Sequence, residues 1–136
     1  TTGAAADDWT NLRGAWQTNL GATVDFEDID TATGQITGGY YPASLPDRRF
    51  ALTGFVNGAG KTEAKTEAKT ESKQHYAVAI SFAVSFQEHG GITAWSGICR
   101  MNSEKPVIDT EDLIIAPMAD YVWSHVIDNH DTLVRK

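Results

Sequence analysis

His130 and Asp131 are adjacent residues that, together with a serine, could supply the three groups of a nucleophilic catalytic triad. Both fall in the strand that we expect over Ser124 to Arg135. Neighbouring side chains of a strand point to opposite faces, so these two could not act in one proton relay. We therefore expect the chain not to be an enzyme.

The sequence also lacks the motifs that bind phosphate or a metal ion. The chain contains no phosphate-binding glycine loop, no His-Glu-x-x-His and no Cys-x-x-Cys. Its histidines lack a recognised metal-ligand spacing, and we expect them at the surface or at strand edges: His75, His89, His125 and His130. The single cysteine, Cys99, cannot form an internal disulfide, and we expect it to pack on a strand. We expect neither a metal nor a cofactor.

The composition indicates one folded domain over residues 1–136 and limits its partners. Apolar residues make up 41% and charged residues 21%, which is typical of a globular protein. The net charge of −7 repels nucleic acid and anionic membranes, so we expect a small-molecule or protein partner. The longest apolar run, Tyr76 to Val84, is well short of the roughly 20 residues that span a bilayer. Thr1 to Asp8 lack the pattern of a signal peptide, which is absent or has been removed, and we expect a secreted protein.

Alternation with a period of two is the main structural pattern, and it points to an all-β protein. In the clearest strand, His75 to Gln87, large side chains from Tyr76 to Phe86 alternate with alanine and serine, as when a sheet packs tightly on both sides. The other expected strands are Arg13 to Gln17, Thr23 to Asp30, Gln35 to Tyr41, Arg49 to Val56, Gly91 to Met101, Asp109 to Ile115 and Ser124 to Arg135.

Turn residues separate these eight strands at short, regular intervals. Eight sequential strands suit an antiparallel up-and-down β-barrel, whose closure removes the sheet edges. Such a barrel has room for one small ligand. A β-sandwich would show the same pattern, so the residues alone leave both architectures open.

Residues Lys61 to Lys73 repeat Lys-Thr-Glu-Ala almost without change. A helix would place lysine over lysine and glutamate over glutamate four residues apart, which is unfavourable. An extended chain instead puts all the charges on one face with alternating sign. We therefore expect a solvated hairpin arm or a mobile loop between the fourth and fifth strands, with a lid over a binding pocket as the functional alternative.

Five short phrases, in the right order and with matching gaps, resemble the avidin and streptavidin family over Leu12 to Thr132. They are Gly14 to Gly21, Thr37-Gly38-x-Tyr40, Leu52-Thr53-Gly54, Thr93-Ala94-Trp95-Ser96-Gly97, and Trp123 through Asp131-Thr132. The resemblance implies an eight-stranded antiparallel up-and-down β-barrel of the avidin type, with a ligand in its interior.

The same resemblance implies a role for several side chains. Tyr40 would donate to the ureido oxygen of biotin, Asp131 would accept from a ureido nitrogen, and Thr93 would face the sulfur. Trp95 and Phe86 would line the ligand's tail, although they and Trp16 are explained equally well as barrel core.

The oligomeric state that the resemblance implies depends on Trp123. In the family pattern it would be offered to the pocket of a neighbouring subunit, and it is harder to explain as core alone. We therefore expect a homo-oligomer, specifically a homotetramer.

Other pocket positions depart from the family pattern. Thr18 stands where the family has asparagine, and Ala22, Pro42 and Gly91 each stand where it has serine. Asp112 stands where a second wall tryptophan is expected. Three lost hydrogen bonds at roughly 1–1.5 kcal/mol each would lower biotin affinity by about three orders of magnitude.

Three functions remain open at this point. The first is a non-catalytic binder of biotin or a biotin-like ligand with an altered polar pocket. The second keeps the barrel but binds a hydrophobic ligand such as a carotenoid-like pigment, because Thr18, Ala22, Pro42 and Phe86 make the cavity more apolar than the family pattern. The third is an oligomerisation module that has lost its ligand.

Overall fold

Eight β-strands and one short 3-10 helix, Thr10–Leu12, make up the computed structural model, which describes residues 10–58, 77–87, 90–100, 106–118, 121 and 124–136. The strands are β1 (Gly14–Gln17), β2 (Thr23–Ile29), β3 (Gln35–Tyr41), β4 (Phe50–Asn57), β5 (Val78–Phe86), β6 (Gly91–Arg100), β7 (Val107–Ile115) and β8 (Val126–Arg135). All eight expected strands are present, with small differences at their ends. The strand expected from Asp109, for example, begins at Val107, which pairs with Val134.

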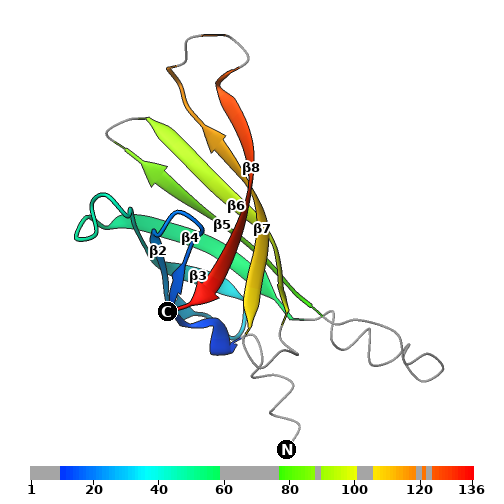
Figure 1. Ribbon diagram of the computed structural model, residues 1–136. Coiled ribbons are helices and arrows are strands. Elements are labelled where there is room, and N and C mark those ends of the chain that lie inside the picture. Colours follow the sequence, from blue (N-terminus) through cyan, green and yellow to red (C-terminus); the bar gives the residue numbers. More distant parts are fainter. Residues whose placement is uncertain (1–9, 59–76, 88–89, 101–105, 119–120, 122–123) are drawn as a thin grey trace, which may run out of the picture.

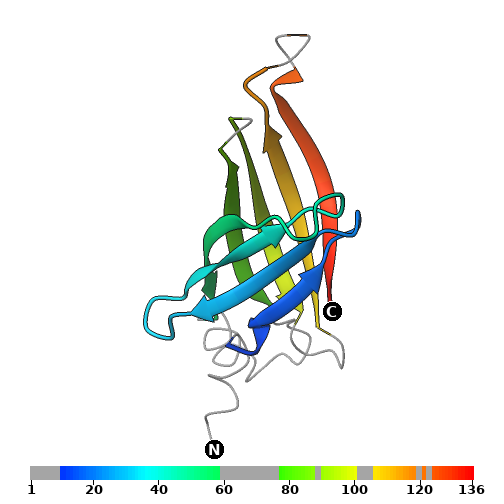
Figure 2. The same cartoon turned by 90° about the vertical axis from the view of Figure 1, so that its left-hand side faces the viewer.

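Each strand pairs antiparallel with the next one along the chain, and β8 pairs with β1 to close the barrel. Figures 1 and 2 show the strands wrapping around one interior. The up-and-down barrel is therefore confirmed, and the sandwich alternative is wrong because a sandwich would leave two separate sheets.

The seam between β1 and β8 is short and is reinforced by Arg135. Only Trp16 and Gln17 of β1 pair with β8. The Arg135 guanidinium lies over the Trp16 ring, 4.3 Å from its centroid, and donates to the carbonyl oxygens of Arg13, at 2.6 Å, and Asn11. One cation thus joins the two ends of the barrel wall through stacking and hydrogen bonds.

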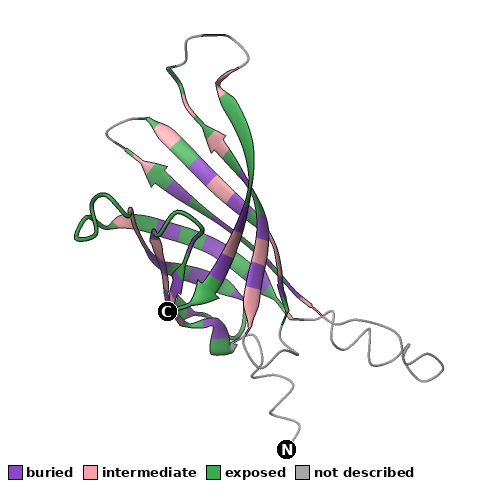
Figure 3. Ribbon diagram, viewed as in Figure 1, coloured by how far each residue is buried: buried purple, intermediate pink, exposed green. Residues whose placement is uncertain are grey.

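Alternate residues along the strands fill the interior. On β5, Val78, Ile80, Phe82 and Val84 are buried, as the sequence predicts. The alanines and serines between them are exposed, so the expectation that this strand packs on both sides is wrong for the chain on its own. A barrel needs only its interior filled, because its outer face can meet solvent directly. Figure 3 shows the resulting alternation of buried and exposed residues along the strands.

The connections of an up-and-down barrel fall alternately at its two ends. Those between β1 and β2, β3 and β4, β5 and β6, and β7 and β8 share one end. At this end the longer strands β5 to β8 project beyond the others (Figure 1). Residues 61–73 lie outside the described residues, so the expected arm is not tested; the strand ends that flank this segment, Asn57 and Val78, belong to the opposite end.

Candidate ligand-binding site

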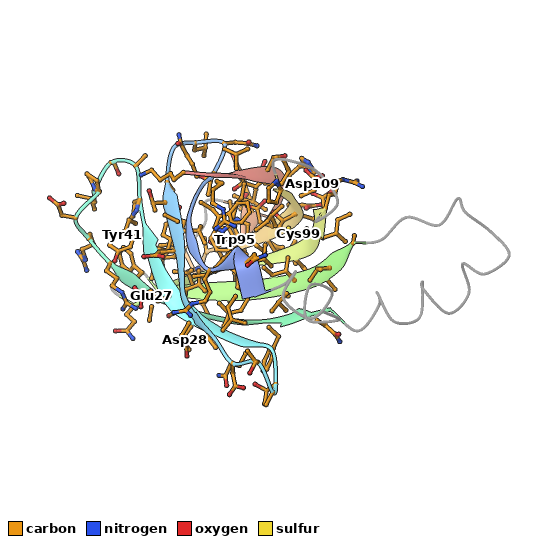
Figure 4. The ribbon with its side chains drawn as sticks, turned by 90° about the horizontal axis from the view of Figure 1, so that it is seen from below. Glu27, Asp28, Tyr41, Trp95, Cys99 and Asp109 are labelled. Atoms are coloured by element: carbon orange, nitrogen blue, oxygen red, sulfur yellow. The ribbon has the colours of Figure 1, made fainter. Side chains whose placement is uncertain are left out.

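Three aromatic side chains from different strands meet in the interior near the projecting end. Tyr40 of β3 lies 5.6 Å from Phe86 of β5 and 5.5 Å from Trp95 of β6, measured between ring centroids. The Phe82 ring stacks on that of Trp95, with 5.0 Å between the centroids. Figure 4 places Trp95 inside the ring of strands. The structure thus brings together three of the expected site residues as an aromatic wall.

Phe50 belongs to the same wall, although it was not among the expected site residues. Its ring lies 4.9 Å from that of Phe86, edge to face, and the Arg48 guanidinium covers it at 4.9 Å. The period of two along β4 carried the signal, because Phe50 shares a face with the buried Leu52 and Val56.

Asp131 is buried, and its carboxylate is held from two directions. One oxygen accepts from the backbone N–H of Asn19, at 2.9 Å, and the other accepts from Trp95 Nε1, at 3.4 Å. His130, its neighbour, is exposed on the outer face and lies 3.6 Å from Glu111. The two side chains therefore point to opposite faces, as the sequence predicts. Asn19, whose role sequence reasoning missed, ties the β1–β2 connection to this carboxylate.

Tyr40 keeps its phenolic proton and is available as a donor. Burial raises the pKa of Tyr40, and the carboxylates of Asp131 and Asp112 raise it further. Both acidic groups therefore act electrostatically on the same hydroxyl.

Thr18, Ala22 and Pro42 border this end of the barrel with few side-chain donors. Thr18 and Ala22 are buried, and the Thr18 hydroxyl oxygen accepts from the backbone N–H of Ala22, at 3.1 Å. That contact leaves the hydroxyl hydrogen of Thr18 free to donate to a ligand. Pro42 begins the β3–β4 connection, where its carbonyl accepts from Leu45, and its side chain carries no polar group.

Asp112 points into the barrel. It is only 3% exposed and pairs in register with Trp95 on β6 and Asn129 on β8. Asn129 interacts with the carboxylate, yet Oδ1 has no hydrogen-bond partner among the described residues. Burial and then the Asp131 charge raise the pKa of Asp112.

A hollow of about 470 Å³ opens beside these residues. Its lining includes Phe86, Gly91 and Thr93, which are expected site residues, together with Ile114 and Met118. On the inner face of β7, Ile114 is the next residue after Asp112 toward the projecting end. On the inner face of β6, Thr93 is likewise the next residue beyond Trp95. The hollow thus lies at the rim of the barrel, two residues along the strands from Asp112 and Trp95, and its lining is mostly apolar, as that of small-molecule sites commonly is.

Some residues singled out in the sequence lie outside the described residues or away from this site. Trp123, His75 and His89 are outside them, so the role expected for Trp123 is still a prediction. Within the described ranges, no three histidine, cysteine or acidic residues are grouped to hold a metal ion, and no helix is long and apolar enough to cross a membrane. Cys99 is fully buried, and burial raises the pKa of its thiol to about 12, which disfavours the reactive thiolate.

Comparison with known proteins connects this geometry to a family. The Avidin family model matches residues 6–136. Xenavidin superposes with a TM-score of 0.68 at 22% identity, covering 93% of this chain and 97% of that one. A shwanavidin variant in complex with biotin gives 0.63 at 18% identity, covering 92% and 97%, and the rhizavidin–biotin complex gives 0.63 at 20%, covering 89% of each chain. The search of curated protein sequences gave no match.

The structural superpositions establish the fold, while the family model extends over nearly the whole chain. Avidin-type proteins are binders without catalytic activity, which confirms the expectation that the chain is not an enzyme. The closed eight-stranded barrel and the family match together show that this chain belongs to the Avidin family.

Proposed function

We propose that this protein binds biotin, or a compound sharing its bicyclic ring, in the space bordered by Tyr40, Trp95 and Asp131. The observation that carries the proposal is their convergence: the two rings lie 5.5 Å apart, and Trp95 Nε1 donates to Asp131 at 3.4 Å. The family match and the two biotin complexes among the related structures support the same ligand.

The site supplies both polar and apolar contacts for such a ligand. Tyr40 and the Thr18 hydroxyl can donate to a carbonyl oxygen, and Asp131 can accept from a ring N–H. Trp95 and Phe86 supply apolar walls that exclude water and strengthen these hydrogen bonds. Ala22 and Pro42 add no side-chain donor, so we propose weaker binding than the complete family pattern would give.

A ligand that is apolar throughout, such as a pigment, fits this space less well. It would cover the Asp112 Oδ1, which has no hydrogen-bond partner among the described residues, without giving it a donor. Covering a polar group in this way costs about 1–3 kcal/mol. Native mass spectrometry and a visible absorption spectrum of the purified protein separate a biotin binder, a pigment carrier and an empty oligomerisation module.

Asp131→Asn is expected to weaken biotin binding by about tenfold to a hundredfold, because a charged acceptor is replaced by a neutral amide of the same shape. Isothermal titration calorimetry measures the loss. Asp128→Asn is the matched control, since Asp128 lies on the same strand but is exposed. Absence of binding to the unmodified protein at millimolar biotin would rule out the proposed function.

The proposed quaternary structure is a homotetramer that uses the outer face of β6 to β8. Ile92, Ile115 and Val126 form one cross-strand row on this face and are 46%, 38% and 55% exposed. Leu113, the next outward-facing residue of β7 after Ile115, extends this apolar surface. A second copy of the same chain, bringing the same apolar row, would cover it.

Val126→Glu is expected to shift the assembly to a smaller species, because burying an unpaired carboxylate in an apolar interface is unfavourable. Multi-angle light scattering at micromolar concentration reports the change. Thr53→Glu, on the exposed outer face of β4, is expected to leave the mass unchanged. A monomeric unmodified protein would contradict the tetramer.

A further inference from the structure

Among the described residues, Asp112 leaves one buried acceptor of the pocket without a donor, which bears on the head group that the pocket selects. The acceptors of the pocket include the Asp131 carboxylate and the Oδ1 of Asp112, which no donor of the described residues reaches. Its side-chain donors include the hydroxyls of Tyr40 and Thr18, whereas Ala22 and Pro42 supply none. A head group rich in donors would complement this arrangement better than one that presents a carbonyl oxygen.

We propose that Asp112 is a specificity-determining residue, and that it selects a ligand whose head group is a planar cationic donor of the guanidinium class. This rests on the proposed function of the same pocket. Asp112 is 3% exposed, and its side chain lies between those of Trp95 and Asn129 on the neighbouring strands. A buried carboxylate oxygen without a partner is unfavourable until a donor reaches it, so a ligand that supplies the donor gains the difference.

The charges around Asp112 support a cation specifically. The register neighbours of Asp112 are uncharged: Trp95 on β6 and Asn129 on β8. The Asp131 carboxylate, two residues along β8 from Asn129 on the same face, acts on Asp112 electrostatically, and both carboxylates act on the Tyr40 hydroxyl. Glu111, on its own strand, is also negative, but its side chain is exposed on the outer face, where water screens its charge. The charges that act on Asp112 within the described part of the chain are thus negative, and two nearby carboxylates attract one cation more strongly than either would alone.

Geometry distinguishes a guanidinium from a simple ammonium. A planar guanidinium presents N–H groups in a fixed fork that matches a carboxylate, or two carboxylates on either side, whereas an ammonium acts as a point charge. The aromatic rings of Tyr40 and Trp95, tilted by 38° against each other, also suit a planar cation. These features favour a cyclic guanidinium over an open-chain amine.

Biotin and 2-iminobiotin are suitable probes because they share ring and tail, and differ only in an oxygen replaced by an imino nitrogen that is protonated at neutral pH. Calorimetry at pH 7.5 is expected to show that the unmodified protein binds 2-iminobiotin about tenfold or more tighter than biotin. Asp112→Asn is expected to lower this preference by about tenfold. Glu111→Gln, its neighbour on β7 with an exposed side chain, is expected to leave the preference within about twofold.

Each outcome of this experiment is decisive. Tighter binding of biotin than of 2-iminobiotin, or a preference unchanged in Asp112→Asn, overturns the role of Asp112 while the proposed function stands. Binding of 2-iminobiotin alone supports the inference and removes biotin as the ligand, whereas binding of neither probe overturns both. If Asp112→Asn does not fold, pH serves instead: affinity for 2-iminobiotin should fall as acid protonates Asp112, and a flat profile from pH 8 to 4 contradicts the inference.

Discussion

The triple variant Thr18→Asn, Ala22→Ser and Pro42→Ser is expected to bind biotin two to three orders of magnitude more tightly than the unmodified protein. Each substitution adds or lengthens a side-chain donor at the end of the barrel where the connections meet. A buried hydrogen bond contributes about 1–1.5 kcal/mol, so three contribute about 3–4.5 kcal/mol if they act independently. The backbone contacts remain possible, since Pro42 uses only its carbonyl oxygen, to accept from Leu45.

Gly91 is best left unchanged in this variant. A Cβ atom there would lie 3.1 Å from the carbonyl oxygen of Ile115, so a serine would require the strands to shift. Competition calorimetry measures the gain, and the three single variants show whether it is additive. An affinity unchanged within threefold would mean that the ligand's carbonyl does not lie near Thr18 and Ala22. The exposed substitution Ser44→Asn, in the same β3–β4 connection, controls for effects on that loop.

The fold was predictable because its signal is local. Val78, Ile80, Phe82 and Val84 show the period of two directly, and each strand pairs with its sequence neighbour, so no long-range information was needed to order the sheet. Alternation does not report what covers the outer face, however. This is why the sequence suggested packing on both sides of β5, whereas its outer residues are exposed in the chain on its own.

The part of the site that depends only on which way a side chain points along its own strand could be predicted from the sequence. Alternation alone separates Asp131 from His130. The contact between Asn19 and Asp131 joins residues 112 positions apart. Whether the Asp112 oxygen finds a partner within the described ranges depends on what the neighbouring strands present. Both follow from cross-strand register, which no local pattern specifies. Phe50 was missed for a different reason, since it starts a strand directly after a connection.

Asp112→Leu is expected to raise the free energy of unfolding of the ligand-free protein by about 2–3 kcal/mol near neutral pH. The substitution removes a buried carboxylate whose Oδ1 has no partner among the described residues, and places an apolar side chain beneath an apolar hollow. For a chain of this length, such a change raises the melting temperature by several degrees. Glu111→Gln, whose side chain is exposed on the same strand, is expected to change stability by less than about 0.5 kcal/mol.

The pH dependence of this gain identifies its cause. Burial and Asp131 raise the pKa of Asp112 in the folded protein, so the folded state holds the proton to higher pH than the unfolded state does. Stability from this group is therefore fully present below the unfolded carboxyl pKa, near 4, and is lost as pH rises through the folded pKa. Denaturant unfolding from pH 4 to 8 should show the advantage of Asp112→Leu growing with pH and then levelling. An advantage that is the same at every pH would instead indicate that better packing, and not removal of the charge, stabilises the variant.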